Sequence, residues 1–292
     1  MRLFRGTTTA IVTPFNKDGS IDRDALRRLI EFQEGMGVDA IAPCGSTGES
    51  AMLSHEEHLE VVSIAVDCAK RAKVIAGAGS NSTAEAVNLS KSAEDVGADG
   101  ILSISPYYVK PTQEGIYLHY KAICESVDIP VVVYNVPGRT GSNITAETIV
   151  RMAEDIGIGA VKEASGNMGQ ILEIIRNRPK GLEVLSGDDA MTLPLLKNGA
   201  DGVISVISNC CPGEMSELVR NGLEGRLEEA DRIQGMLDPL FDLLFVESNP
   251  IPIKYIMGRL GFGSGQVRLP LTPLTMPNRE RMDSLMERMG IF

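Results

Sequence analysis

The chain alternates between short runs of β-branched and apolar residues and longer segments whose apolar positions recur every three or four residues. The short runs are typical of strands and the longer segments of amphipathic helices such as Asp22–Gly37 and Ser54–Arg71. One strand with its helix takes about 20 to 35 residues, the size of a βα unit. The predicted strands are Thr8–Val12, Ala40–Pro43, Val74–Ala76, Gly100–Ile104, Val131–Tyr134, Ile158–Lys162, Glu183–Leu185 and Val203–Val206.

A short internal repeat marks the junctions between helix and strand. It occurs at Gly37–Ile41, Gly97–Ile101 and Gly199–Val203, each with Gly first, Asp third and a β-branched residue last. Glycine suits the left-handed residue that follows a helix, and the β-branched residue opens a strand. Strict alternation with strands too apolar to have a wet face indicates a parallel sheet covered by helices. Eight units predict a (β/α)8 barrel (TIM barrel) in preference to an open doubly wound sheet.

The alternation stops after residue 222. Leu223–Phe245, Pro252–Leu260 and Pro277–Met289 read as helices joined by connections that contain Pro and Gly. We therefore expect a catalytic barrel domain over residues 1–222 and a C-terminal helical extension over residues 223–292. A chain of 292 residues has room for one large barrel and such an extension.

Composition and charge narrow the possible partners. Apolar residues make up 43% of the chain and charged residues 23%, the balance of a globular protein with a sizeable core. The net charge of −11 and the lack of Lys and Arg clusters exclude nucleic acid and anionic membranes as expected partners. With no signal peptide at Met1–Phe15, no long apolar run and no Cys-x-x-Cys spacing, we expect a cytoplasmic protein.

Histidine is scarce. The chain has only His55, His58 and His119, too few for a His-rich metal site, and we expect neither a metal nor a cofactor. In a parallel barrel the functional groups lie at the carboxyl ends of the strands. The second predicted strand runs there into Gly45–Ser50, a turn rich in hydroxyls whose N–H groups suit a carboxylate or phosphate, although an ordinary βα turn has the same composition.

The sixth predicted strand ends in Lys162, directly before Glu163. A lysine at the end of a buried strand either pairs with a carboxylate such as Glu163 or points into the barrel mouth as a nucleophile. At the usual pKa only about one amine in 2,500 is neutral at pH 7, so a nucleophilic lysine requires desolvation or a nearby proton acceptor. Four of the six tyrosines fall near one barrel mouth, and Tyr134 on the neighbouring strand could move the proton. These four are Tyr107, Tyr108, Tyr117 and Tyr134.

Seven motifs, in order along nearly the whole chain, resemble the 4-hydroxy-tetrahydrodipicolinate (dihydrodipicolinate) synthase family. The lysine strand and the hydroxyl loop are shared with other pyruvate-dependent lyases and aldolases, whereas Arg139 in its Pro-Gly-Arg-Thr-Gly setting is more discriminating. The family often has two threonines at Ser46–Thr47, and serine keeps the hydroxyl. The motifs are Gly45–Ser50, Pro106–Tyr108, Tyr134–Gly141, Val161–Ser165, Leu185–Asp189, Gly202–Ser205 and Asn249–Pro252.

The resemblance implies that Lys162 forms a Schiff base with pyruvate and that Tyr134 is the general acid and base. Thr47 and Tyr108 would complete a hydroxyl relay, the latter across an interface of a homotetramer built as a dimer of dimers. Ser46 and Thr47 would bind the pyruvate carboxylate, and Arg139 would bind that of L-aspartate-4-semialdehyde. Backbone groups near Gly187 and Ile204 would line the pocket. The product, 4-hydroxy-tetrahydrodipicolinate, enters diaminopimelate and lysine biosynthesis.

The resemblance also implies a feedback site for L-lysine. The simpler interpretation of His55 and His58 is that they belong to the polar first turn of a helix, since Ser54–Glu57 has the pattern of a capping box. In the family, however, enzymes that L-lysine inhibits use a site at a dimer interface. Seven positions match that site: Ser50, Ala51, His55, His58, Asn81, Glu85 and Tyr107.

Two alternatives stay open. The chain could be another pyruvate-dependent lyase, such as an N-acetylneuraminate lyase or a 2-keto-3-deoxy-sugar acid aldolase, because these share the lysine strand. It could also be a non-catalytic barrel that binds lysine or pyruvate. Trapping of a pyruvate imine by borohydride separates an enzyme from such a binding protein.

Overall fold

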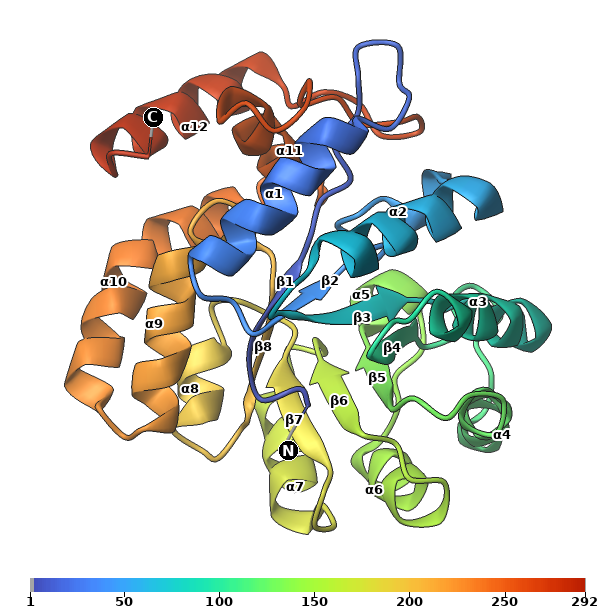
Figure 1. Cartoon of the computed structure of the whole chain (residues 1–292). Coiled ribbons are helices and arrows are strands. Elements are labelled where there is room, and N and C mark those ends of the chain that lie inside the picture. The colour runs from blue at the N-terminus through green and yellow to red at the C-terminus, as the bar shows by residue number, and fades with distance from the viewer. Residues whose placement is uncertain (1–2, 292) are drawn as a thin grey trace.

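The computed structural model describes residues 3–291 and confirms the predicted barrel. Eight strands, each parallel to its neighbours, close in chain order, and helices surround them (Figure 1). The strands are β1 (Gly6–Ala10), β2 (Ala40–Ala42), β3 (Lys73–Gly77), β4 (Gly100–Ile104), β5 (Val131–Asn135), β6 (Ala160–Glu163), β7 (Glu183–Ser186) and β8 (Gly202–Ser205).

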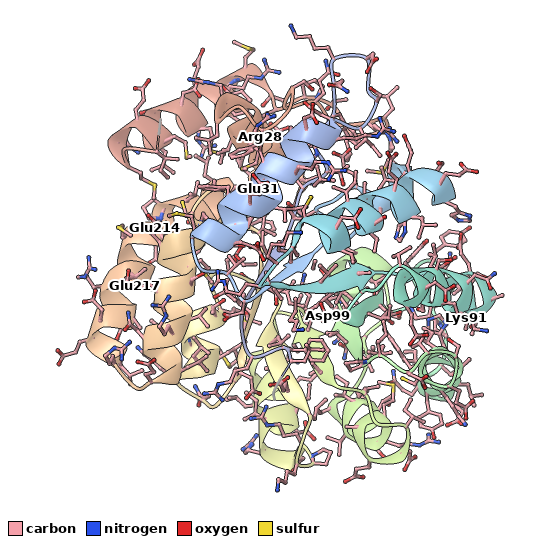
Figure 2. All side chains as sticks on the ribbon, viewed as in Figure 1. Arg28, Glu31, Lys91, Asp99, Glu214 and Glu217 are labelled. Atoms are coloured by element: carbon pink, nitrogen blue, oxygen red, sulfur yellow. The ribbon has the colours of Figure 1, made fainter. Side chains whose placement is uncertain are left out.

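The helices that follow the strands form the outer layer. Their charged residues face solvent, as Arg28 and Glu31 on the first helix and Glu217 on α9 show (Figure 2). The α-helices up to the end of the barrel are α1 (Arg23–Gly35), α2 (His55–Cys68), α3 (Thr83–Asp95), α4 (Gln113–Cys124), α5 (Pro137–Thr140), α6 (Ala146–Asp155), α7 (Met168–Asn177), α8 (Thr192–Leu196) and α9 (Pro212–Leu223). Two short 3-10 helices, η1 (Ser50–Met52) and η2 (Ile207–Asn209), lie in the loops after β2 and β8.

The C-terminal helical region consists of α10 (Leu227–Leu243), α11 (Ile251–Arg259) and α12 (Met276–Arg288). Helix α10 lies beside α9, and α11 lies near α1, where the rings of Phe32 and Phe262 are 5.4 Å apart (Figure 1). The predicted helix over Leu223–Phe245 starts too early, because Leu223 is the last residue of α9. Gly225, with φ +78°, adopts the left-handed conformation that ends α9 and separates it from α10.

Two apolar layers hold the barrel. The larger layer lies between strands and helices, and the smaller one fills the inside of the barrel with Tyr134, Leu185, Ile204 and small residues such as Ala10. Phe4 belongs to the inner layer. A Cβ on Gly100 would lie 3.1 Å from the Phe4 ring, and one on Gly159 only 2.7 Å, so both glycines leave room for this ring. The inside is therefore a packed core.

Helix α2 begins with the predicted capping box. The Ser54 hydroxyl accepts a hydrogen bond from the Glu57 N–H, and the Glu57 carboxylate accepts one from the Ser54 N–H. Within residues 3–291, no helix combines the length and the apolar character needed to span a membrane.

Candidate active site

A cavity of about 190 Å³ opens at the carboxyl ends of the strands. It brings together six of the residues expected in the active site, namely Ser46, Thr47, Tyr134, Arg139, Lys162 and Gly187. The rest of its lining comes from the same strand ends and from the C-terminal region: Ala10, Gly45, Leu102, Val136, Ala164, Asp188, Val206, Phe245 and Asn249.

Lys162 enters this cavity from β6, where it pairs in register with Tyr134 of β5 and Leu185 of β7. Successive side chains of a strand point to opposite faces, so Lys162 faces inward and Glu163 outward. The Glu163 carboxylate accepts hydrogen bonds from Asn135 Nδ2 at 3.0 Å and Gln170 Nε2 at 2.9 Å. The alternative of an ion pair between Lys162 and Glu163 is therefore wrong.

The Lys162 amine is desolvated. Its residue is 5% exposed, and its Nζ lies 4.3 Å from the centroid of the Tyr134 ring. Burial lowers the pKa of Lys162 to about 8, an effect that the charge of Asp189 opposes and that of Arg139 supports. A far larger share of this amine is neutral at pH 7 than for an exposed lysine, which is the form that attacks a carbonyl carbon.

Tyr134 supplies the phenol ring that this amine contacts. It is 8% exposed, and burial raises the pKa of Tyr134 to about 12, against the weaker opposing effect of Arg139. The phenol is therefore protonated at neutral pH, so it can donate a proton to an oxygen in the cavity and take it back.

Asp189 was given no role in the sequence analysis, yet its charge acts on the Lys162 amine. It is buried at the loop after β7, and its Oδ2 accepts hydrogen bonds from the N–H groups of Val206 and Ile207, both at 2.9 Å. Burial raises the pKa of Asp189, while these hydrogen bonds favour the carboxylate. Its position directly after Gly187 and Asp188, at a strand end, was the available signal.

Asn249 was also missed, although its motif was noted. It reaches the cavity from the segment before α11, and its Nδ2 donates a hydrogen bond to Thr47 Oγ1 at 3.0 Å. Its backbone oxygen accepts a hydrogen bond from Arg139 Nη2 at 3.1 Å. Arg139 itself lies on the one-turn helix α5. One asparagine thus contacts both the hydroxyl loop, 202 residues earlier in the sequence, and Arg139, 110 residues earlier.

Gly187 allows the close approach of Lys162. A Cβ at this position would lie 2.8 Å from Ala164 Cβ and 3.1 Å from Lys162 Cε, too close for either neighbour. Glycine is therefore required by space here and not by backbone conformation.

Tyr108 and Ile204 lie outside the lining of this cavity within the described residues. Tyr108 is 86% exposed and has a positive φ of 70°, and its N–H donates a hydrogen bond to the Thr140 oxygen at 3.1 Å. Ile204 is fully buried in β8 as part of the inner apolar layer. In a single chain, neither side chain meets the Lys162 amine.

A second cavity, of about 470 Å³, adjoins the first. The two share Ser46, Tyr134 and Arg139 in their linings. Of the seven residues expected at the feedback site, Asn81 does not line this second cavity. The other six do: Ser50, Ala51, His55, His58, Glu85 and Tyr107.

Glu85 is the partly exposed carboxylate of the second cavity, whereas Glu49, which also contributes to the lining, is buried. A His55 ring nitrogen lies 2.8 Å from its Oε1, and the Ser80 hydroxyl donates to its Oε2. These two contacts, that of Ser80 first, lower the pKa of Glu85. His58 is buried against the Gly77 oxygen at 2.6 Å, and burial lowers the pKa of His58. The cavity therefore offers the carboxylate of Glu85 at neutral pH. In the described range 3–291, no group of three His, Cys, Asp or Glu side chains is arranged to hold a metal ion.

Comparison with known proteins places the chain in one family. The model of the dihydrodipicolinate synthetase family matches residues 3–289. The 4-hydroxy-tetrahydrodipicolinate synthase of Syntrophus aciditrophicus is 51% identical, over 99% of this chain and 100% of the relative. The crystal structure of dihydrodipicolinate synthase from Aquifex aeolicus has a TM-score of 0.97 and 45% identity, and it covers 99% of both chains. The Cyanidioschyzon merolae enzyme with lysine bound has a TM-score of 0.97 and 41% identity, over 100% of both chains. The chain therefore belongs to the dihydrodipicolinate synthetase family.

Proposed function

We propose that the chain condenses pyruvate with L-aspartate-4-semialdehyde to 4-hydroxy-tetrahydrodipicolinate, the first committed step of diaminopimelate and lysine biosynthesis. The observation that carries this proposal is the desolvated amine of Lys162, which shares a cavity with the Tyr134 phenol and the Arg139 guanidinium. The names of the relatives favour this activity over the alternative lyases.

The reaction begins at the keto carbon of pyruvate. The neutral amine of Lys162 attacks this carbon, and Tyr134 protonates the oxygen so that it leaves as water. The resulting iminium draws electrons from the neighbouring methyl carbon, which loses a proton and becomes an enamine. The enamine attacks the aldehyde carbon of the second substrate, and the aldehyde oxygen takes up a proton. Finally the amine of that substrate attacks the imine carbon, closes the ring and expels the Lys162 amine.

The carboxylates fix the orientation of both substrates. Ser46 and Thr47 offer two hydroxyls for the pyruvate carboxylate, and Gly187 and Val206, the latter two residues after Ile204, also line that pocket. Arg139 lines both cavities and binds the carboxylate of the semialdehyde at the entrance, since a guanidinium recognises a carboxylate through two parallel hydrogen bonds.

The Arg139→Ala variant tests this assignment. It should lose turnover of the semialdehyde and keep the pyruvate imine, which borohydride traps on Lys162. Turnover of N-acetylneuraminate or of a sugar acid, in place of the semialdehyde, would contradict the proposed activity. Absence of both the imine and turnover in the unaltered protein would indicate a binding protein.

We also propose that Thr47 and Tyr108 complete a hydroxyl relay in a homotetramer built as a dimer of dimers. The exposure of Tyr108 supports a role in the site of a second copy. Mixed assemblies of Lys162→Ala and Tyr108→Phe chains should then regain activity that neither variant has alone. Mixing Lys162→Ala with Lys162→Met chains is the control, and equal activity in both mixtures would contradict the relay across an interface. A cytoplasmic location belongs to the same proposal, and cell fractionation tests it.

Feedback by L-lysine is the regulatory part of the proposal. The second cavity supports it, because Glu85 offers a carboxylate to the side-chain ammonium of lysine beside Ser50, His55 and Tyr107. We assign Ala51, His58 and Asn81 to the same site. Activity should fall as L-lysine is added, and the Glu85→Gln variant should be less sensitive. A flat activity curve up to millimolar lysine would contradict this assignment.

A further inference from the structure

A second lysine is buried as deeply as Lys162. Lys254, on α11, is 2% exposed, and its Nζ lies 2.8 Å from Glu49 Oε1. The same amine donates a hydrogen bond to the Thr13 oxygen and lies 3.9 Å from the centroid of the Phe15 ring. Lys254 does not line either cavity, and its amine is bound to Glu49 and Thr13, so it is not a second nucleophile.

Glu49, its partner, belongs to the hydroxyl loop Gly45–Ser50 and lies two residues after Thr47. It adopts the left-handed conformation, with φ 58° and ψ 34°, and its side chain is fully buried. Its second oxygen, Oε2, accepts a hydrogen bond from the Arg268 N–H at 2.9 Å. Both oxygens of this carboxylate are therefore held by residues of the C-terminal region, Lys254 and Arg268.

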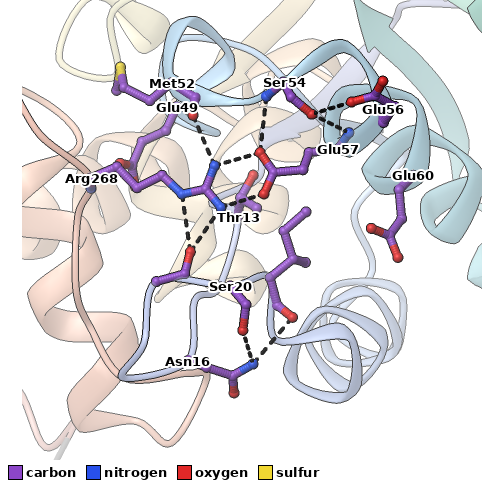
Figure 3. A network of polar contacts seen from close by, with 12 residues as sticks. Thr13, Asn16, Ser20, Glu49, Met52, Ser54, Glu56, Glu57, Glu60 and Arg268 are labelled. Atoms are coloured by element: carbon purple, nitrogen blue, oxygen red, sulfur yellow. Dashed lines mark hydrogen bonds and ion pairs between the residues drawn. The ribbon is translucent and has the colours of Figure 1, made fainter.

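The side chain of Arg268 extends the same attachment to the first turn of α2. Figure 3 shows its guanidinium between Met52 and Glu57, with hydrogen bonds to the Met52 oxygen at 2.9 Å and to Glu57 Oε2 at 2.6 Å. It also donates to the Gly19 oxygen at 2.8 Å. The segment between the hydroxyl loop and α2 is thus fixed at its start by Lys254 and at its end by Arg268.

The buried ion pair is a poor device for stability alone. Taking an ammonium and a carboxylate out of water costs several kcal/mol per ion, and apolar residues of the same volume often serve a core as well. What this pair provides is a fixed position of the two loops relative to α11. It joins the loops after β1 and β2 to α11, and Thr13 Oγ1 adds a hydrogen bond to the Gly48 oxygen at 2.7 Å.

We propose that Lys254 and Glu49 are positioning residues that hold Ser46 and Thr47 where the pyruvate carboxylate binds. The C-terminal region thereby supports the hydroxyl loop of the substrate site through Lys254. Asn249 orients the Thr47 hydroxyl by a direct hydrogen bond. This inference rests on the proposed imine at Lys162, since Ser46 and Thr47 matter only for a substrate held there.

The test measures the pyruvate concentration that half-saturates the Lys162 imine, trapped by borohydride and quantified by mass spectrometry. The variants are Lys254→Met, Glu49→Gln and the double variant, each studied at a temperature where circular dichroism shows it folded. Each single variant should raise the half-saturating concentration about tenfold or more, because a displacement of about 1 Å of a positioning group costs up to about 100-fold. The double variant should be less impaired than the two single effects combined predict, because no unpaired charge is left buried.

A matched control is the ion pair of Arg178 and Asp201 before β8, at the opposite end of the barrel. Asp201 is 2% exposed, so Arg178→Met removes one partner of a buried carboxylate that keeps its contacts with Arg5 and Val184, and it should lower the melting temperature without changing imine half-saturation. If folded Lys254→Met and Glu49→Gln match the unaltered protein in half-saturation and lose only stability, the inference is overturned. If the unaltered protein forms no Lys162 adduct, the proposed function itself fails.

Discussion

The rate at which Lys162 forms an imine should follow the titration of its buried amine as the pH is raised from 6 to 10. Burial beside the Tyr134 ring lowers the pKa of Lys162 to about 8, whereas an exposed lysine has a pKa of 10.5. Only the neutral amine attacks pyruvate. Initial rates should therefore rise about tenfold per pH unit below pH 8 and level off above it.

The size of the effect follows from the two pKa values. At pH 7 a pKa of about 8 leaves about 9% of the amine neutral, and a pKa of 10.5 leaves about 0.03%. The cavity therefore supplies about 300 times more nucleophile at this pH. Arg139→Gln should move the inflexion to higher pH, because the Arg139 charge lowers the Lys162 pKa, and Asp189→Asn should move it to lower pH.

The assay is rapid quenching of the protein and subsaturating pyruvate into borohydride at each pH, with the adduct counted by mass spectrometry. Lys162→Ala is the blank. Burial also lowers the pKa of Lys254 to about 8, so the adduct must be mapped to its peptide. Rates that keep rising tenfold per unit beyond pH 9 would refute the argument, because the amine would then titrate like an exposed lysine.

Three further predictions concern packing and charge. Gly187→Ala should slow imine formation about tenfold or more, because the added methyl displaces the Lys162 side chain. His119 should destabilise the fold in acid: burial lowers the pKa of His119 from 6.5 to about 4, so the unfolded chain binds the proton first as the pH falls. Urea unfolding should show a loss of about 2 to 3 kcal/mol between pH 7 and 4.5 that His119→Gln removes. Arg268→Met should lower the free energy of unfolding by about 3 kcal/mol, because Glu57 and two backbone oxygens lose their donor.

Each of these has its own control. Gly235 in α10 has no heavy atom within 4 Å of an added Cβ, so Gly235→Ala should leave imine formation unchanged. Equal slowing in both glycine variants would refute the packing argument. Equal acid sensitivity of the unaltered protein and His119→Gln would show that other groups cause it. Unchanged urea unfolding of Arg268→Met would mean that its hydrogen bonds in the fold only replace those made to water.

The barrel and the position of Lys162 could be predicted because the local pattern of apolar residues determines both. The change between the two-residue period of strands and the 3.6-residue period of helices defines βα units, and eight units close into a barrel. Lys162 lies one residue before the end of the buried strand β6, so its position follows from the strand alone. The one-turn helix α5 was not expected, since Pro137 and Gly138 favour a turn as much as the first turn of a helix.

The supporting contacts could not be predicted, because they join residues far apart in sequence. Glu49 and Lys254 are 205 positions apart, and only the packing of α11 onto the loops after β1 and β2 brings them together. The sequence held one signal, a lone lysine within the otherwise apolar Ile251–Met257 segment. Tyr108 shows the opposite case: its position in the chain groups it with the other phenols, yet its side chain is exposed and does not line the Lys162 cavity of its own chain.

The most direct test of the central claim is to reduce the protein with borohydride in the presence of pyruvate and to map the modified peptide by mass spectrometry. The proposed function predicts one reduced pyruvate on Lys162, lost when L-aspartate-4-semialdehyde is added before the reductant and drives turnover. An unmodified protein, or an adduct on Lys254 in place of Lys162, would contradict it.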